Sequence, residues 1–92
     1  MTGGAEAETR RKRFRMRCWR RGTKEMDLIL GPFADAVAEG REAADLTPFE
    51  ALIEENDQDL YAWISGAAPA PARHAPAVER LQAFVERMRF ST

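Results

Sequence analysis

The organisation of this chain is decided by residues 20–25, which read Arg-Arg-Gly-Thr-Lys-Glu. They separate a basic segment from a segment in which apolar residues recur with helical spacing. Gly22 can adopt backbone conformations that other residues avoid, and a carboxylate such as Glu25 complements the dipole of a helix that begins beside it. The stretch therefore predicts an exposed corner between two helices.

Helical signals extend from this corner in both directions. Before it, Thr9 is a suitable N-cap for a helix that runs to about Arg20. After it, a second helix is expected from about Thr23 to Gly40, because its apolar residues repeat every three or four positions. These residues are Met26, Ile29, Leu30, Phe33 and Val37. Pro32 predicts a kink in this helix and not its end, since the apolar stripe continues beyond it.

The second half of the chain predicts three further helices. One starts at Thr47, which caps it, and the next starts at Asp57, which caps it, and ends at Gly66. A connector with three prolines follows at residues 67–76, and a last helix runs to about residue 89. No strand pattern is present. We therefore expect an all-α fold, a small bundle of about five short helices.

The length of 92 residues indicates one domain with a thin core. We expect this single helical domain at residues 9–90, after a disordered tail at residues 1–8 that is rich in small and acidic residues. Trp63 is expected in the core, whereas Tyr61 suits either the core or an interface.

Composition excludes several classes of protein. The chain is 45% hydrophobic and 32% charged, without an apolar run long enough to span a membrane or an apolar segment typical of a secretory signal. Its one cysteine, Cys18, has no internal disulfide partner and fits a reducing compartment. Cys18 and the lone His74 have no partners at metal-ligand spacing and do not suggest a catalytic pair. A cytoplasmic, bacterial-type protein is the simplest interpretation.

The net charge of −1 hides a strong asymmetry along the chain. Nine basic residues lie between positions 10 and 24, whereas positions 25–59 carry eleven acidic residues against Arg41 alone. The basic first helix suits nucleic acid, since arginines that neutralise phosphates release counterions. The acidic remainder argues against this, because it would repel the phosphate backbone. A small nucleic-acid-binding or regulatory module remains the alternative hypothesis.

The corner itself has two interpretations on local chemistry alone. Structurally, Glu25 complements the dipole of the second helix, Arg21 pairs with Glu25 or Asp27, and Gly22 only ends the first helix. Functionally, the same exposed charges dock a partner.

Surrounding motifs resemble a known family. Residues 18–27 read Cys-Trp-Arg-Arg-Gly-Thr-Lys-Glu-Met-Asp and contain the pattern R-G-x-x-E. Further on, residues 49–53 (Phe-Glu-Ala-Leu-Ile) and 57–64 (Asp-Gln-Asp-Leu-Tyr-Ala-Trp-Ile) are similar to F-x-x-L-L and D-x-D-L-x-x-W segments. In order and spacing these resemble the succinate dehydrogenase assembly factors, also called FAD assembly factors or flavinators. The resemblance covers residues 10–90, with Thr23 where a methionine is common in the family.

The resemblance implies a non-enzymatic, monomeric assembly factor. It would bind the flavoprotein subunit of succinate dehydrogenase, of the related fumarate reductase, or of both, and promote covalent attachment of FAD to a histidine of that subunit. FAD would be attached to the partner and not held by this chain as a prosthetic group. Arg21, Gly22 and Glu25 take the R-G-x-x-E positions at the partner interface, and Arg20 and Asp27 flank them.

Overall fold

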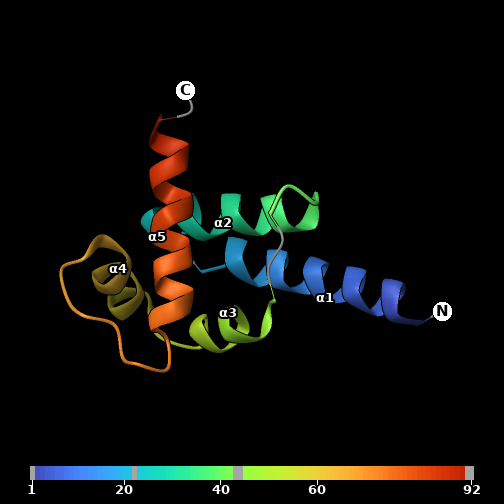
Figure 1. The fold of residues 1–92 in the computed structure, drawn as a ribbon, viewed down its shortest axis with the longest axis horizontal. Coiled ribbons are helices and arrows are strands. Elements are labelled where there is room, and N and C mark those ends of the chain that lie inside the picture. Colours follow the sequence, from blue (N-terminus) through green and yellow to red (C-terminus); the bar gives the residue numbers. More distant parts are fainter. Residues whose placement is uncertain (1, 22, 43–44, 91–92) are drawn as a thin grey trace. The chain divides into compact units, whose positions relative to one another are not determined.

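The computed structural model of the chain describes residues 2–21, 23–42 and 45–90. Within these residues the chain forms five helices and no strand (Figure 1), so the expected all-α fold is confirmed. The helices are α1 (Thr2–Trp19), α2 (Lys24–Ala38), α3 (Thr47–Leu52), α4 (Asp57–Ser65) and α5 (Ala75–Phe90). The chain divides into two compact units, residues 1–46 and 47–92.

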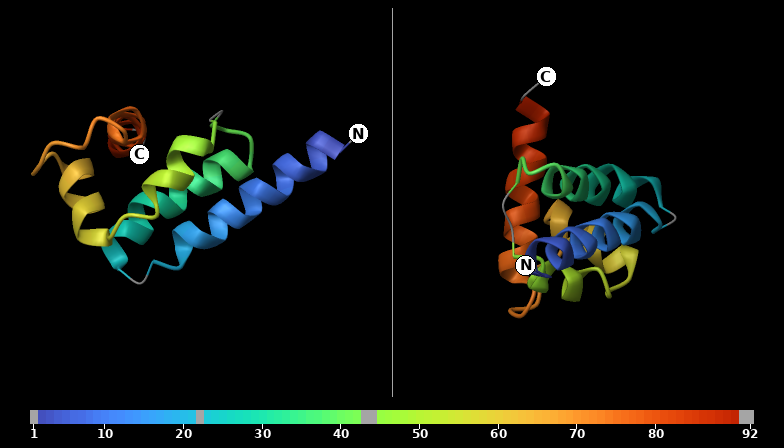
Figure 2. Two further views of the ribbon diagram at one scale, coloured as in Figure 1. Left: turned by 90° about the horizontal axis from the view of Figure 1, so that it is seen from below. Right: turned by 90° about the vertical axis from the view of Figure 1, so that its right-hand side faces the viewer.

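The first unit is a pair of helices, in which α1 lies alongside α2 (Figures 1 and 2). Phe14 and Cys18 are four residues apart on α1 and are both buried, as helical spacing predicts. The ring of Phe14 meets Phe33 of α2 edge to face, with centroids 6.4 Å apart and planes at 81°. The α2 residues Met26 and Leu30 are also buried, so the predicted apolar stripe is the buried side of α2.

The first helix begins earlier than its sequence predicts. The expected start at Thr9 is wrong, because α1 begins at Thr2 and residues 4–8 form its early turns. Most of these residues are exposed, and an ion pair of 3.3 Å joins Glu8 to Lys12 one turn later. The early turns of α1 thus form without apolar periodicity, which is the sequence signal that predicts a helix. The division into a tail at 1–8 and one domain at 9–90 stays a prediction.

The second helix continues through Gly31 and Pro32, as its apolar stripe predicts. It ends where Gly40 was expected to close it. Gly40 adopts a positive φ of 80°, and the Arg41 N–H donates to the Ala36 carbonyl at 2.8 Å. The predicted kink at Pro32 stays a prediction.

The second unit contains α3, α4 and α5, with α5 packed against each of the other two. Leu52 of α3, Leu60 of α4 and Leu81 of α5 are fully buried. Gly66 ends α4 with a φ of 85°, as predicted. Residues 67–74 then connect to α5 without a helix, in agreement with their proline content.

Two details of this unit differ from the sequence prediction. Asn56, and not Asp57, caps α4, because the extended backbone of Asn56 lets its side-chain oxygen accept from the Asp59 N–H at 2.9 Å. Trp63 is half-buried and not part of the core, while Tyr61 is 47% exposed. None of the helices formed by the described residues is long and apolar enough to cross a membrane.

Candidate functional site

The predicted docking residues lie at the junction between α1 and α2. Arg20 follows the last residue of α1 and is exposed, and Arg21 is half-buried. Glu25 and Asp27 both occupy the first turn of α2, where Glu25 is exposed and Asp27 is half-buried. Gly22 lies outside the described residues. Four of the five predicted residues are therefore gathered at one corner, although their contacts with a partner are untested.

Thr23 is the N-cap residue of α2. Thr23 has the extended backbone of an N-cap residue, with φ −112° and ψ 136°, but its side chain makes no capping hydrogen bond. Acidic groups in the first turn complement the helix dipole, which is the structural role expected for Glu25. One oxygen of Asp27, Oδ1, is buried without a hydrogen-bond partner among the described residues.

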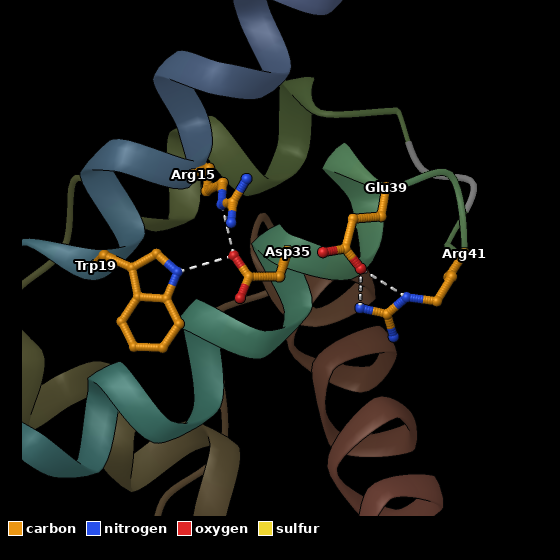
Figure 3. A network of polar contacts seen from close by, with 5 residues as sticks. All are labelled: Arg15, Trp19, Asp35, Glu39 and Arg41. Carbon is orange, nitrogen blue, oxygen red and sulfur yellow. Dashed lines mark hydrogen bonds and ion pairs between the residues drawn. The ribbon is translucent and has the colours of Figure 1, made fainter.

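A polar clamp joins α1 to α2 beside this corner, as Figure 3 shows. Asp35 accepts at Oδ1 from the indole Nε1 of Trp19 at 2.9 Å. The same oxygen forms an ion pair with Nε of Arg15 at 2.7 Å. Trp19 and Arg15 are four residues apart on one side of α1, so both side chains can bind the carboxylate of Asp35. We call Arg15, Trp19, Gly31 and Asp35 the Asp35 clamp.

Gly31 makes room for the indole within the Asp35 clamp. A Cβ atom at position 31 would lie 2.5 Å from Cε2 and Cζ2 of Trp19, well inside van der Waals contact. Only glycine lets the tryptophan ring rest on the backbone of α2. Trp19 is nevertheless 42% exposed, because its other side faces solvent. The clamp thus holds a large aromatic ring in a fixed position at the surface.

Sequence reasoning missed the Asp35 clamp. Neither Trp19 nor Gly31 was assigned a role from the sequence, which predicted only a kink at Pro32 in that part of the second helix. The available signal was a glycine inside a helix with an aspartate four residues later, opposite an arginine four residues before a tryptophan. This pattern can be interpreted only once α1 and α2 are known to pack against each other.

Cys18 lies close to the corner but has no reactive character. It is fully buried, and burial raises the pKa of its thiol to about 12, against the smaller opposing effects of Arg21 and Arg17. The thiol is therefore protonated at neutral pH, whereas a nucleophilic cysteine needs the thiolate.

A second polar cluster lies in the second unit and was also missed. His74 is buried, and its Nε2 lies 3.0 Å from Oε2 of Glu55. The hydrogen bond from His74 lowers the pKa of Glu55 below its ordinary value of 4.5, against the opposing effect of desolvation, and the hydrogen bond from Arg73 lowers it further. Trp63 lies beside the imidazole, with ring centroids 5.7 Å apart. His74 therefore joins the connector to the segment between α3 and α4.

The described residues offer no clear catalytic constellation. They contain no group of three or more histidine, cysteine or acidic side chains that could hold a metal ion. A surface pocket of about 390 Å³ in the second unit is lined by residues of α4, the connector and α5, and Glu79 is the only titratable residue in its described lining.

Comparison with known proteins identifies relatives over most of the chain. A model of the family described as flavinator of succinate dehydrogenase matches residues 12–85. The FAD assembly factor SdhE of Acetobacter pasteurianus is 37% identical over 73 residues, which cover 78% of this chain and 67% of that protein. The FAD assembly factor SdhE of Haemophilus ducreyi is 31% identical over 81 residues, which cover 87% of this chain and 98% of that protein.

A fungal relative is much longer than this chain. The mitochondrial succinate dehydrogenase assembly factor 2 of Mycosarcoma maydis is 37% identical over 68 residues, which are 74% of this chain but 29% of that protein. No solved structure matches the chain. The names of these relatives do not favour the alternative of a nucleic-acid-binding module.

Proposed function

The chain belongs to the family of succinate dehydrogenase flavinators, and we propose that it binds the flavoprotein subunit of succinate dehydrogenase and promotes covalent attachment of FAD to that subunit. The observation that carries this proposal is the family match over residues 12–85, which includes residues of all five helices. Bacterial relatives of similar sequence bear the name FAD assembly factor.

The corner between α1 and α2 is the proposed docking site, formed by Arg20, Arg21, Gly22, Glu25 and Asp27. Its support is that exposed groups of opposite charge, on Arg20 and Glu25, lie at adjoining ends of two helices. Charge-assisted hydrogen bonds from such groups are strong and directional, which suits recognition of one partner. Gly22 would allow the partner backbone to approach closely.

The chain is proposed to act by binding and not by supplying reacting groups. Cys18 is buried and protonated, and His74 is buried against Glu55, so neither is presented to a partner. Attachment of FAD uses a histidine of the partner and needs preorganised groups in a closed site. By binding the productive arrangement of the subunit more tightly than other arrangements, the chain raises its population. We place this activity in the cytoplasm, in a monomer whose single cysteine fits a reducing compartment.

Co-expression with the flavoprotein subunit tests the proposal. The subunit is produced with and without this chain, and covalent flavin is measured by in-gel fluorescence after denaturation. We expect the chain to raise the flavin signal per amount of subunit. An unchanged signal with a folded, co-expressed chain would contradict the proposal. Parallel experiments with succinate dehydrogenase and fumarate reductase subunits distinguish the two targets.

A further inference from the structure

The Asp35 clamp presents an apolar surface next to the proposed docking site. Trp19 is held from one side by Gly31 and at its Nε1 by Asp35, so its ring has little freedom to lose when another molecule covers it. Side chains that are ordered before binding lose less conformational entropy on association. The 42% of Trp19 that remains exposed is thus a preorganised aromatic face.

Leu28 extends this surface towards the corner. It is 58% exposed, the largest exposed fraction among the large apolar side chains of the described residues. Glu25, Leu28, Gly31 and Asp35 follow one another at spacings of three and four residues, so they share one side of α2. Trp19 rests on that side, at Gly31. Leu28 therefore lies between the Asp35 clamp and Glu25.

The charges around Trp19 and Leu28 are mainly positive. Arg20 directly follows Trp19, and Lys24 precedes Leu28 by one turn on α2; both side chains are exposed. The carboxylate of Asp35 is already paired with Arg15 and Asp27 is half-buried, which leaves Glu25 as the exposed acidic group of this rim. A partner with carboxylates around an apolar side chain would be complementary to this arrangement.

From these observations we infer that Trp19 and Leu28 form an apolar anchor site, which receives an apolar side chain flanked by carboxylates on the flavoprotein subunit. The inference rests on the proposed function and adds to it the chemistry of the partner surface. Aromatic residues that are fixed in place commonly dominate the affinity of an interface, while charges at the rim set the association rate and its salt dependence.

The first test measures affinity of the full chain for the unlabelled flavoprotein subunit. Leu28→Gln keeps a good helix former at a largely exposed position, so the fold should be retained. We expect the Kd to rise about tenfold or more, as truncation of an interface anchor does. The matched control is Tyr61→Gln on α4, which also replaces an exposed apolar side chain and should leave the Kd within about twofold. Equal Kd values for wild type and Leu28→Gln would overturn the inference.

The second test follows Trp19 itself. The chain has two tryptophans, so a Trp63→Phe variant labelled with 5-fluorotryptophan reports on Trp19 alone by ¹⁹F NMR. Binding of the unlabelled subunit should shift the Trp19 resonance and reduce its solvent isotope shift, because water leaves the exposed side of the ring. A resonance that stays unchanged at saturation would place Trp19 outside the interface and overturn the inference.

Other outcomes separate this inference from the proposed function. Sedimentation analysis that shows dimerisation of the wild type, lost in Leu28→Gln, would assign the surface to a second copy of this chain and contradict the inference. If the wild-type chain neither binds the subunit nor raises its covalent flavin, the proposed function fails and the inference with it. If the wild type does both while Leu28→Gln binds equally well, only the inference fails.

Discussion

Gly31 and Trp19 are in contact so close that a single methyl group would not fit between them. A Cβ atom at position 31 would lie 2.5 Å from the indole ring. The two residues belong to adjacent helices, and the contact brings Nε1 of Trp19 within 2.9 Å of Asp35, one turn further along α2. Four predictions follow from this relationship and from the other sites.

Gly31→Ala should destabilise the first unit. The added methyl group displaces Trp19 from its hydrogen bond, and overpacking of this kind costs about 1–3 kcal/mol. Urea unfolding followed by circular dichroism measures the loss. The matched control is Gly4→Ala, a helical glycine with open space around its Cβ, which should leave stability unchanged or slightly raised. Equal stability of both variants would mean that Trp19 moves aside without cost.

Glu25→Ala should separate docking from helix stabilisation. Loss of a first-turn carboxylate costs the helix less than about 1 kcal/mol, so the variant should stay folded. We expect covalent flavin on the partner to fall strongly in co-expression. The control is Glu86→Ala, which removes an exposed carboxylate of α5 in the second unit. If covalent flavin falls only in proportion to folded Glu25→Ala protein, the role of Glu25 is structural.

Glu55 should make stability depend on pH in the acidic range. Its pKa is lowered in the folded chain, chiefly by the hydrogen bond from His74, so the unfolded chain binds its proton more readily. The stabilisation is therefore present above the unfolded pKa, near 4.5, and is lost as the pH falls through the folded pKa. Glu55→Gln should flatten the curve of unfolding free energy against pH below about 4.5, whereas Glu54→Gln should not flatten it to the same extent. Identical curves for Glu55→Gln and wild type would contradict the role of this pair.

Cys18 should be inert in the folded chain. Its side chain is buried and its pKa is about 12, so the thiolate is scarce at neutral pH and reagents cannot reach it. Reaction with a chromogenic disulfide reagent at pH 8 should be slow in buffer and fast in concentrated urea. Rapid reaction without denaturant would show that the contact between α1 and α2 opens readily.

Much of the fold could be predicted because it depends on local signals. The stripe from Met26 to Val37 marks the buried side of α2, and Gly40 and Gly66 end their helices with positive φ. The start of α1 could not be predicted in this way. Its early turns carry no apolar periodicity, so the N-cap signal at Thr9 was the only guide, and it was misleading.

The polar contacts within each of the two units could not be predicted from local signals. Trp19 and Asp35 are 16 residues apart, and Glu55 and His74 are 19 apart. Each contact depends on how one segment pairs with another. Arg15 lies one turn before Trp19 on α1, and Asp35 lies one turn after Gly31 on α2. Trp19 contacts Gly31, and both Arg15 and Trp19 bind Asp35. The residue types were visible in the sequence, but this register was not.

The placement of the two tryptophans has a consequence for the folding of the chain. Trp19 lies in the first unit and Trp63 in the second, and these are its only tryptophans. Two single-tryptophan variants, one that keeps Trp19 and one that keeps Trp63, therefore report separately on the two halves by tryptophan fluorescence. Coincident denaturation curves for the two variants would indicate one cooperative transition, and separate midpoints would indicate that each half melts by itself. The chain contains its own pair of reporters for deciding whether a flavinator of this size folds in one step or two.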